Sequence, residues 1–245
     1  MRKYIINGIL ALGLLSFGAC NKSEKTAQNH PAEGQVIDTL VSTPNEMYQG
    51  VLPCADCEGI FTTITLAPDQ TFDKTDYYLG KNEYFTEEGS YTVDASTGIY
   101  ALSSNNDKAT QYYQREEGKL VLLNDKKEKN TGANAHTYEL EQLSNDDYHF
   151  TQSPVEGFLI IGHEVSSFRP ANSAKVYWIE DPSGELQKRY EAMVKDKKIP
   201  YFPVKANLVL EKDTKKAEGF AEDYDGVVVV KKLLDLKLIS VGNIG

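Results

Sequence analysis

The chain has 245 residues, of which 40% are hydrophobic and 25% charged, and its formal net charge at pH 7 is −10. This length allows one large all-β domain or two small domains. The acidic balance argues against nucleic acid as a partner, because phosphate binding requires a basic surface.

The first 19 residues have the pattern of a secretory signal peptide. Arg2 and Lys3 precede an apolar stretch over residues 5–17, which is too short to span a membrane. The end of this stretch, Phe17-Gly18-Ala19-Cys20, resembles a bacterial lipobox, in which two small residues stand directly before a cysteine. That resemblance implies cleavage before Cys20, acylation of Cys20 and a lipid anchor in an envelope membrane. The alternative is an ordinary signal peptide with a chance cysteine.

Residues 20–46 then form an expected polar tether, because they lack Phe, Tyr and Trp and show no sustained hydrophobic period. The rest of the chain divides by charge into two expected domains. Residues 47–147 carry 8 Lys/Arg against 18 Asp/Glu, a net charge of −10, whereas residues 148–245 carry 14 of each.

The first domain shows the alternating pattern of a β-meander. Strands are expected at residues 60–66, 85–93, 99–102, 111–114, 120–123 and 137–143, separated by polar turns about ten residues apart. Such a series most readily closes into an antiparallel barrel. Many of the 15 tyrosines fall in these strands, where they are expected as half-buried strand surface.

The second domain is expected to combine strands with one helix. Strands are predicted at residues 157–162, 175–180 and 208–210, and an extended segment is expected at residues 199–203. Residues 226–239 supply one more strand, or two if the run bends. Leu186, Tyr190 and Met193 have helical spacing within a helix over residues 185–194, with Asp181 or Ser183 as its cap. This order is compatible with a five-stranded barrel of the OB type.

The motif Cys54-Ala55-Asp56-Cys57 admits three interpretations. In an exported protein the two thiols are expected to pair as a disulfide. They could instead bind Cu(I) as two soft thiolate ligands. An enzymatic dithiol is disfavoured, because a strand rather than a helix is expected after the motif and acidic neighbours raise thiol pKa values.

The residues around this motif resemble the opening of the NlpE (CutF) family of outer-membrane lipoproteins. The resemblance rests on residues 48–60, with sequence YQGVLPCADCEGI, and continues to about residue 143. Further matching positions are Leu66, Asp69, Phe72, Tyr77, Tyr78, Gly80 and residues 85–91.

This resemblance implies a mainly β fold, with an N-terminal lipocalin-like antiparallel barrel followed by a C-terminal OB-type barrel with one helix. It also implies an outer-membrane location facing the periplasm, a role in copper homeostasis or envelope-stress signalling, and an envelope sensor kinase or other envelope protein as partner. Cys54 and Cys57 correspond to the family's redox- or copper-responsive pair. One departure is clear: no cysteine follows Cys57, whereas enterobacterial members carry a second pair in their C-terminal domain.

We therefore expect a non-enzymatic, lipid-anchored envelope protein, with Cys54 and Cys57 oxidised or holding Cu(I). The alternative is a lipocalin-like binding module, since an eight-stranded barrel has room for one small apolar ligand or for its own side chains.

Overall fold

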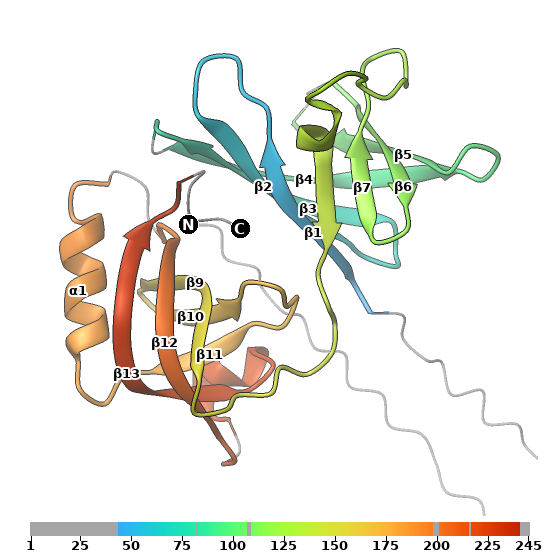
Figure 1. Cartoon of the computed structure of the whole chain (residues 1–245). Coiled ribbons are helices and arrows are strands. Elements are labelled where there is room, and N and C mark those ends of the chain that lie inside the picture. Colours follow the sequence, from blue (N-terminus) through green and yellow to red (C-terminus); the bar gives the residue numbers. More distant parts are fainter. Residues whose placement is uncertain (1–43, 82, 107–108, 198–200, 216, 241–245) are drawn as a thin grey trace, which may run out of the picture. The chain divides into compact units, whose positions relative to one another are not determined.

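The computed structural model describes residues 44–81, 83–106, 109–197, 201–215 and 217–240. The described residues form two closed β-barrels, one of eight strands and one of five, with a single α-helix (Figure 1). The predicted fold class is confirmed.

The eight-stranded barrel is a continuous antiparallel meander in which each strand pairs with the next along the chain. β1 closes the barrel by pairing with β8, where Tyr48 faces Gln142 and Gln49 faces Glu141. Its strands are β1 (Glu46–Leu52), β2 (Gly59–Leu66), β3 (Thr71–Leu79), β4 (Glu83–Asp94), β5 (Ile99–Ser104), β6 (Gln111–Glu116), β7 (Lys119–Leu122) and β8 (Glu139–Gln142).

Large side chains from all around this barrel fill its interior. β2 and β3 are neighbouring strands of the barrel wall. Their pairing places Ile64 opposite Lys74 and Leu66 opposite Phe72. Tyr48, Leu102 and Leu140 pack in the same cluster of buried residues. The interior is therefore occupied by the protein's own side chains.

Two charged side chains of β3 are buried in this interior. Lys74 Nζ lies 2.5 Å from Asp76 Oδ2, and the two side chains are only 3% and 10% exposed. The Thr62 hydroxyl donates a 2.7 Å hydrogen bond to the other carboxylate oxygen of Asp76. Glu87 of β4 lies opposite Lys74 in the register. Pairing of this kind is what permits charges to be buried.

The five-stranded barrel consists of β9 (Pro154–Gly162), β10 (Val165–Pro170), β11 (Tyr177–Glu180), β12 (Val204–Asp213) and β13 (Val227–Leu238). Around the barrel the order is β9, β10, β11, β13 and β12, which pairs again with β9. β11 and β13 run parallel, and the other pairs are antiparallel. This is the Greek-key order expected of an OB-type barrel.

Helix α1 (Glu185–Val194) has the predicted bounds and buries Leu186 and Tyr190 beside β13 (Figure 1). Both predicted capping residues contribute, although Gly184 occupies the N-cap position. The Asp181 carboxylate accepts hydrogen bonds from the Leu186 and Gln187 backbone N–H groups. The Ser183 hydroxyl oxygen accepts one from the Glu185 backbone N–H. These acceptors satisfy N–H groups that have no partner within the helix.

Several local predictions need correction. The strand expected at residues 137–143 is shorter, because Ala135–Tyr138 form a 3-10 turn before β8. The run at residues 226–239 does not bend into two strands: it forms the single strand β13, as the first of the two predicted alternatives has it. β1, β3 and β10 were not among the predicted strands. The expected extended segment that includes residues 199 and 200 lies partly outside the described residues.

The prediction that strand tyrosines are half-buried is wrong for several of them. Tyr48 and Tyr113 are 0% exposed, and Tyr77 is 2% exposed. Burial raises the pKa of Tyr77 to about 12. The Tyr48 and Tyr113 rings belong to the core of the eight-stranded barrel, because a closed barrel has an interior that an open half-solvated sheet lacks.

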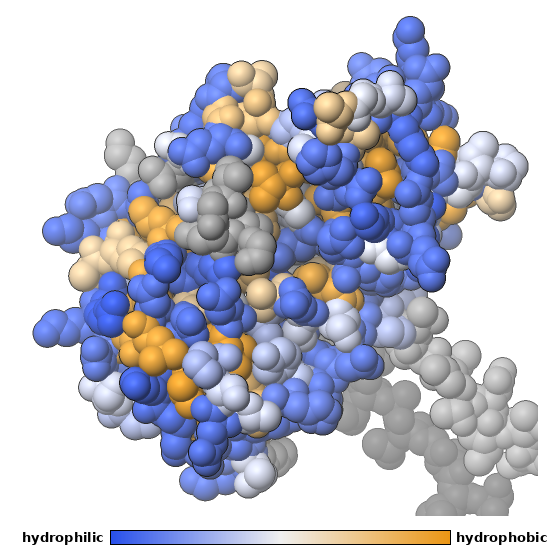
Figure 2. All heavy atoms as spheres, in the orientation of Figure 1, coloured by the Kyte–Doolittle hydropathy of each residue, from blue (hydrophilic) through white to orange (hydrophobic). Residues whose placement is uncertain are grey.

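Hydrophobic side chains on the face shown in Figure 2 form small separate patches within a largely hydrophilic surface. No helix in the described part of the chain combines the length and hydropathy needed to cross a membrane.

Candidate functional site

The two cysteines of the first domain lie in the loop that joins β1 to β2. This loop, residues 53–58, is called the CxxC loop below. Cys54 and Cys57 are partly buried, whereas Ala55, Asp56 and Glu58 are exposed. The motif is therefore at the protein surface, at one end of the eight-stranded barrel.

Cys54 and Cys57 are joined by a disulfide, with an S–S distance of 1.99 Å and a Cα–Cα distance of 5.3 Å. The bridge closes a loop with a sequence separation of only three residues. Cys57 Sγ also lies 3.3 Å from the Gly59 carbonyl oxygen. The structure thus brings together the two sulfurs that the sequence proposed as a pair.

A lysine from a distant part of the sequence completes this site. Lys81 follows β3, and its Nζ donates a 2.5 Å hydrogen bond to Asp56 Oδ2. This contact with Lys81 lowers the pKa of the Asp56 carboxyl below its ordinary value. The other Asp56 oxygen lies 3.6 Å from Cys54 Sγ. The negative charge beside the sulfurs is therefore partly neutralised, which the sequence pattern around the cysteines did not predict.

The end of the CxxC loop is held by the backbone independently of the disulfide. The Glu58 N–H donates a 3.3 Å hydrogen bond to the Leu79 carbonyl oxygen. Gly59 has a φ of +153°, and a Cβ at this position would lie 2.6 Å from Val51 Cγ1. Glycine is required here because any side chain would clash with β1. The loop has anchors that remain when the S–S bond breaks.

The loop could bind a soft metal ion only when the Cys54–Cys57 disulfide is reduced to two thiols. One ligand atom from each of Cys54, Asp56 and Cys57 lies within 4.8 Å of the others. Two thiolates suit Cu(I), and metal binding favours their deprotonation. Sulfurs that are bonded to each other do not supply those thiolates, so a two-electron reduction must come first. The Asp56 oxygen is a harder ligand and is already paired with Lys81.

The surroundings of the pair differ from those of a thiol–disulfide enzyme. The residue that follows Glu58 begins strand β2, as the sequence predicted. A CxxC at a helix N-terminus has its thiolate stabilised by the helix dipole. At this loop the nearby positive charge is that of Lys81, which forms an exposed salt bridge with Asp56 instead of contacting a sulfur.

Among the described residues, the histidine and aspartate side chains considered next add no ligand to the Cys54–Cys57 site. Cys20 and His30 lie outside the described residues. His163 is 85% exposed, with Glu164 at 3.8 Å. In the sequence Asp223-Tyr224-Asp225-Gly226, the Asp225 carboxylate accepts a hydrogen bond from the Val176 N–H and contacts Lys175 Nζ at 3.1 Å. Asp225 thus has a structural role.

The interior of the eight-stranded barrel offers little support for the alternative of an apolar ligand. Tyr48, Ile64, Tyr113, Leu120 and Leu140 are each 0% exposed within it. The Lys74–Asp76 ion pair lies in the same interior. Side chains occupy the space that a lipid would need.

Comparisons with known proteins agree on one family. Residues 48–133 match the family model of the NlpE N-terminal domain, which confirms the predicted resemblance. Lipoprotein NlpE of Escherichia coli (strain K12) is 24% identical over 192 residues, 78% of each chain.

Two solved structures are also similar to the chain. The crystal structure of the Cpx pathway activator NlpE from Escherichia coli is 22% identical, covers 78% of this chain and 94% of its own, and has a TM-score of 0.32. A candidate lipoprotein from Shewanella oneidensis is 36% identical, covers 39% of this chain and 85% of its own, and has a TM-score of 0.36.

Proposed function

We propose that this chain, which carries an NlpE N-terminal domain over residues 48–133, is a lipid-anchored envelope protein that reports the redox or copper state of its compartment through Cys54 and Cys57. The observation that carries the proposal is the position of the pair. The disulfide lies within the family-matched segment, at the surface, in a loop with anchors of its own.

A response to redox state requires that the disulfide can open while the barrel stays folded. A thiol reductant of the envelope would supply two electrons and two protons, break the S–S bond and leave two thiols. The backbone hydrogen bond from Glu58 to Leu79 and the Lys81–Asp56 contact do not involve the sulfurs. Reduction therefore changes the loop locally and leaves the β1–β2 pairing in place.

A response to copper would act on the reduced pair. Cu(I) accepts two thiolates as soft ligands, and the only thiols after Cys20 are Cys54 and Cys57. Copper binding and disulfide formation would then compete for the same sulfurs. In this proposal the pair has a signalling role and performs no catalysis.

The anchor and the partner belong to the same proposal. Cys20 would be acylated and hold the protein at the outer membrane facing the periplasm, with residues 20–46 as the tether. Its relative from Escherichia coli is described as a Cpx pathway activator, which supports an envelope sensor kinase as the partner here. The proposed domains are residues 47–147 and 148–245, and limited proteolysis should cut near residue 147.

The direct test is expression in an Escherichia coli strain that lacks its own NlpE, with Cpx pathway output as the readout. The wild-type chain should raise the output when copper or a thiol reductant is added. The Cys54→Ser, Cys57→Ser variant should lose this response at equal protein levels, and Ala55→Ser in the same loop is the matched control. An unchanged response in the double variant would contradict the role of the pair.

The lipid anchor is tested separately with Cys20→Ser. Labelled palmitate should enter the wild-type chain and be absent from the variant, and the variant should leave the membrane fraction. Labelling of the variant at the wild-type level would overturn the assignment of Cys20.

A further inference from the structure

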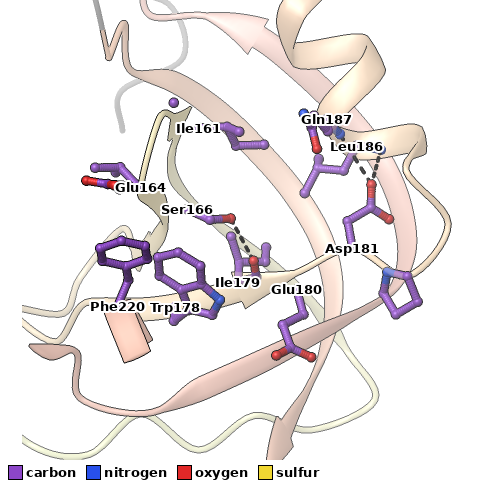
Figure 3. Close-up of a pocket in the computed structure, with 13 residues that line it drawn as sticks. Ile161, Glu164, Ser166, Trp178, Ile179, Glu180, Asp181, Leu186, Gln187 and Phe220 are labelled. Carbon is purple, nitrogen blue, oxygen red and sulfur yellow. Dashed lines mark hydrogen bonds between the residues drawn. The ribbon is translucent and has the colours of Figure 1, made fainter. Parts of the chain in front are cut away.

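The five-stranded barrel carries an aromatic groove that the cysteine pair does not explain. A pocket of about 530 Å³ lies between the β9–β10 turn, β11 and the 3-10 turn at Gly219–Asp223 (Figure 3). A second pocket of about 650 Å³ shares three of its lining residues, Trp178, Glu180 and Phe220. We call the first pocket, with these shared residues, the aromatic groove. Barrels of this strand order bind their ligands at this face, between the same two loops.

Two aromatic rings are presented in the groove. Trp178 and Phe220 both line the groove (Figure 3), and Phe220 is 54% exposed. The Trp178 ring has an edge contact with Tyr224, at a centroid distance of 5.4 Å. The Trp178 backbone N–H donates to the Gly226 carbonyl oxygen at 2.9 Å. These contacts fix the tryptophan in place while part of its surface remains open.

Some polar groups of the groove already have partners within the fold. The Ser166 hydroxyl donates to the Ile179 carbonyl oxygen at 2.7 Å (Figure 3). The Asp181 carboxylate caps helix α1 through Leu186 and Gln187. These groups position the walls of the groove.

The exposed charged groups of the groove are carboxylates. Glu164, in the β9–β10 turn, and Glu180, at the end of β11, are both exposed and line the groove. The adjoining pocket adds Asp213 and Glu218 against one base, Lys215. Ionised carboxylates only accept hydrogen bonds. A partner that matches the groove must therefore donate hydrogen bonds and carry positive charge.

We propose that the aromatic groove binds a basic peptide segment of a partner protein. Lysine and arginine side chains only donate hydrogen bonds, and they also bind to the face of a tryptophan ring. Their charge complements Glu164 and Glu180, whereas anionic partners such as nucleic acid or acidic lipid are repelled. Two adjoining pockets on either side of the Trp178–Phe220 pair accommodate successive side chains. The proposal is independent of Cys54 and Cys57.

Trp178 makes the test specific, because it is the only tryptophan of the chain. The purified full-length chain is titrated with a tetra-arginine peptide while the tryptophan fluorescence is recorded. A cationic peptide can also associate with the acidic eight-stranded barrel, but that association does not place a ligand against Trp178. We expect saturable quenching or a spectral shift, and anisotropy of a labelled peptide gives the affinity.

Three variants define the groove. Replacing Glu164→Gln and Glu180→Gln together should weaken binding by up to about fivefold for each carboxylate. Phe220→Ala should weaken it by about two- to fivefold. Glu211→Gln is the matched control, since Glu211 is an exposed acid of β12 that pairs with Lys231, and it should leave the affinity unchanged. Circular dichroism verifies that each variant is folded.

Other outcomes overturn the proposal. Equal affinities for the wild type and the Glu164→Gln, Glu180→Gln variant would mean that the peptide binds elsewhere. A fluorescence change with neutral chitotetraose and none with the peptide would identify a glycan site instead. An absence of any change in Trp178 fluorescence with the peptide would also reject the proposal. None of these outcomes bears on the cysteine pair, whose test uses different variants.

Discussion

Loss of the Cys54–Cys57 disulfide should weaken the eight-stranded barrel only modestly. The bridge has a sequence separation of three residues and closes a ring of four. The chain entropy that such a crosslink removes from the unfolded state corresponds to about 2 kcal/mol at 25 °C. A disulfide that closes a longer loop would stabilise the fold more, so this one is among the less stabilising disulfides that a chain can form. Its loss should leave a folded barrel.

The assay is urea unfolding of wild type and of Cys54→Ser, Cys57→Ser, followed by circular dichroism. We expect the free energy of unfolding to fall by about 2 kcal/mol, with little change in the slope against urea concentration because the buried surface is unchanged. Ala55→Ser, an exposed neighbour, should stay within about 0.5 kcal/mol of wild type. Wild type in a thiol reductant should behave like the double variant.

A loss of more than about 5 kcal/mol, or an unfolded variant, would refute this reasoning. Either result would mean that the disulfide is needed for the fold. A bond required for the fold cannot open as a signal while the barrel remains intact.

Three further predictions concern side-chain contacts. Lys74→Met should lower the free energy of unfolding in urea by about 3–5 kcal/mol, because it leaves the buried Asp76 charge without its lysine partner. Lys74→Met combined with Asp76→Leu should recover most of this loss. A double variant as unstable as Lys74→Met alone would refute the pairing. Lys81→Met should raise the pKa of Asp56 towards 3.8 in an NMR titration. The Lys81 contact stabilises the folded state above pH 3.8, and this stabilisation is lost as the pH falls through the lower pKa that Asp56 has in the folded state. An Asp56 pKa that is the same in the variant and in wild type would contradict the contact. Asp181→Ala should destabilise the protein by about 0.5–2 kcal/mol, because helix α1 loses acceptors for two N–H groups; an unchanged midpoint of thermal unfolding would contradict this role.

The sequence predicted elements well where hydrophobic period and turn residues agree. Helix α1 has Leu186 and Tyr190 four residues apart and capping side chains just before it. Strand β5 follows the turn that ends at Gly98, which has a positive φ of 70°. Helical spacing, capping residues and turn glycines all lie within a few residues of the element that they define, so they can be recognised in the sequence alone.

Strand β3 was missed because its burial depends on partners elsewhere in the chain. Lys74 and Asp76 occupy positions where an alternating strand would present hydrophobic side chains to the interior. Their burial is compensated by their mutual ion pair and by Thr62 of the neighbouring strand. A pattern of hydrophobic residues cannot reveal a buried ion pair.

The candidate site was predicted in part. Cys54 and Cys57 are three residues apart, so their pairing needs only local geometry. Lys81 is 25 residues from Asp56, and only the pairing of β2 with β3, which places Gly59 opposite Leu79, brings the two together. The aromatic groove also requires the closed five-stranded barrel, since Trp178 and Phe220 are 42 positions apart in the sequence.

The thiol state of Cys54 and Cys57 in intact cells tests the proposed function most directly. Cells that produce the full chain are exposed to graded amounts of a thiol reductant, with and without copper. Free thiols are trapped with a mass-shifting maleimide, and envelope-stress output is measured in parallel. We expect the pair to be oxidised in untreated cells and the output to follow the loss of the disulfide. An output that is the same at every disulfide fraction, or that persists in Cys54→Ser, Cys57→Ser, would contradict the proposal.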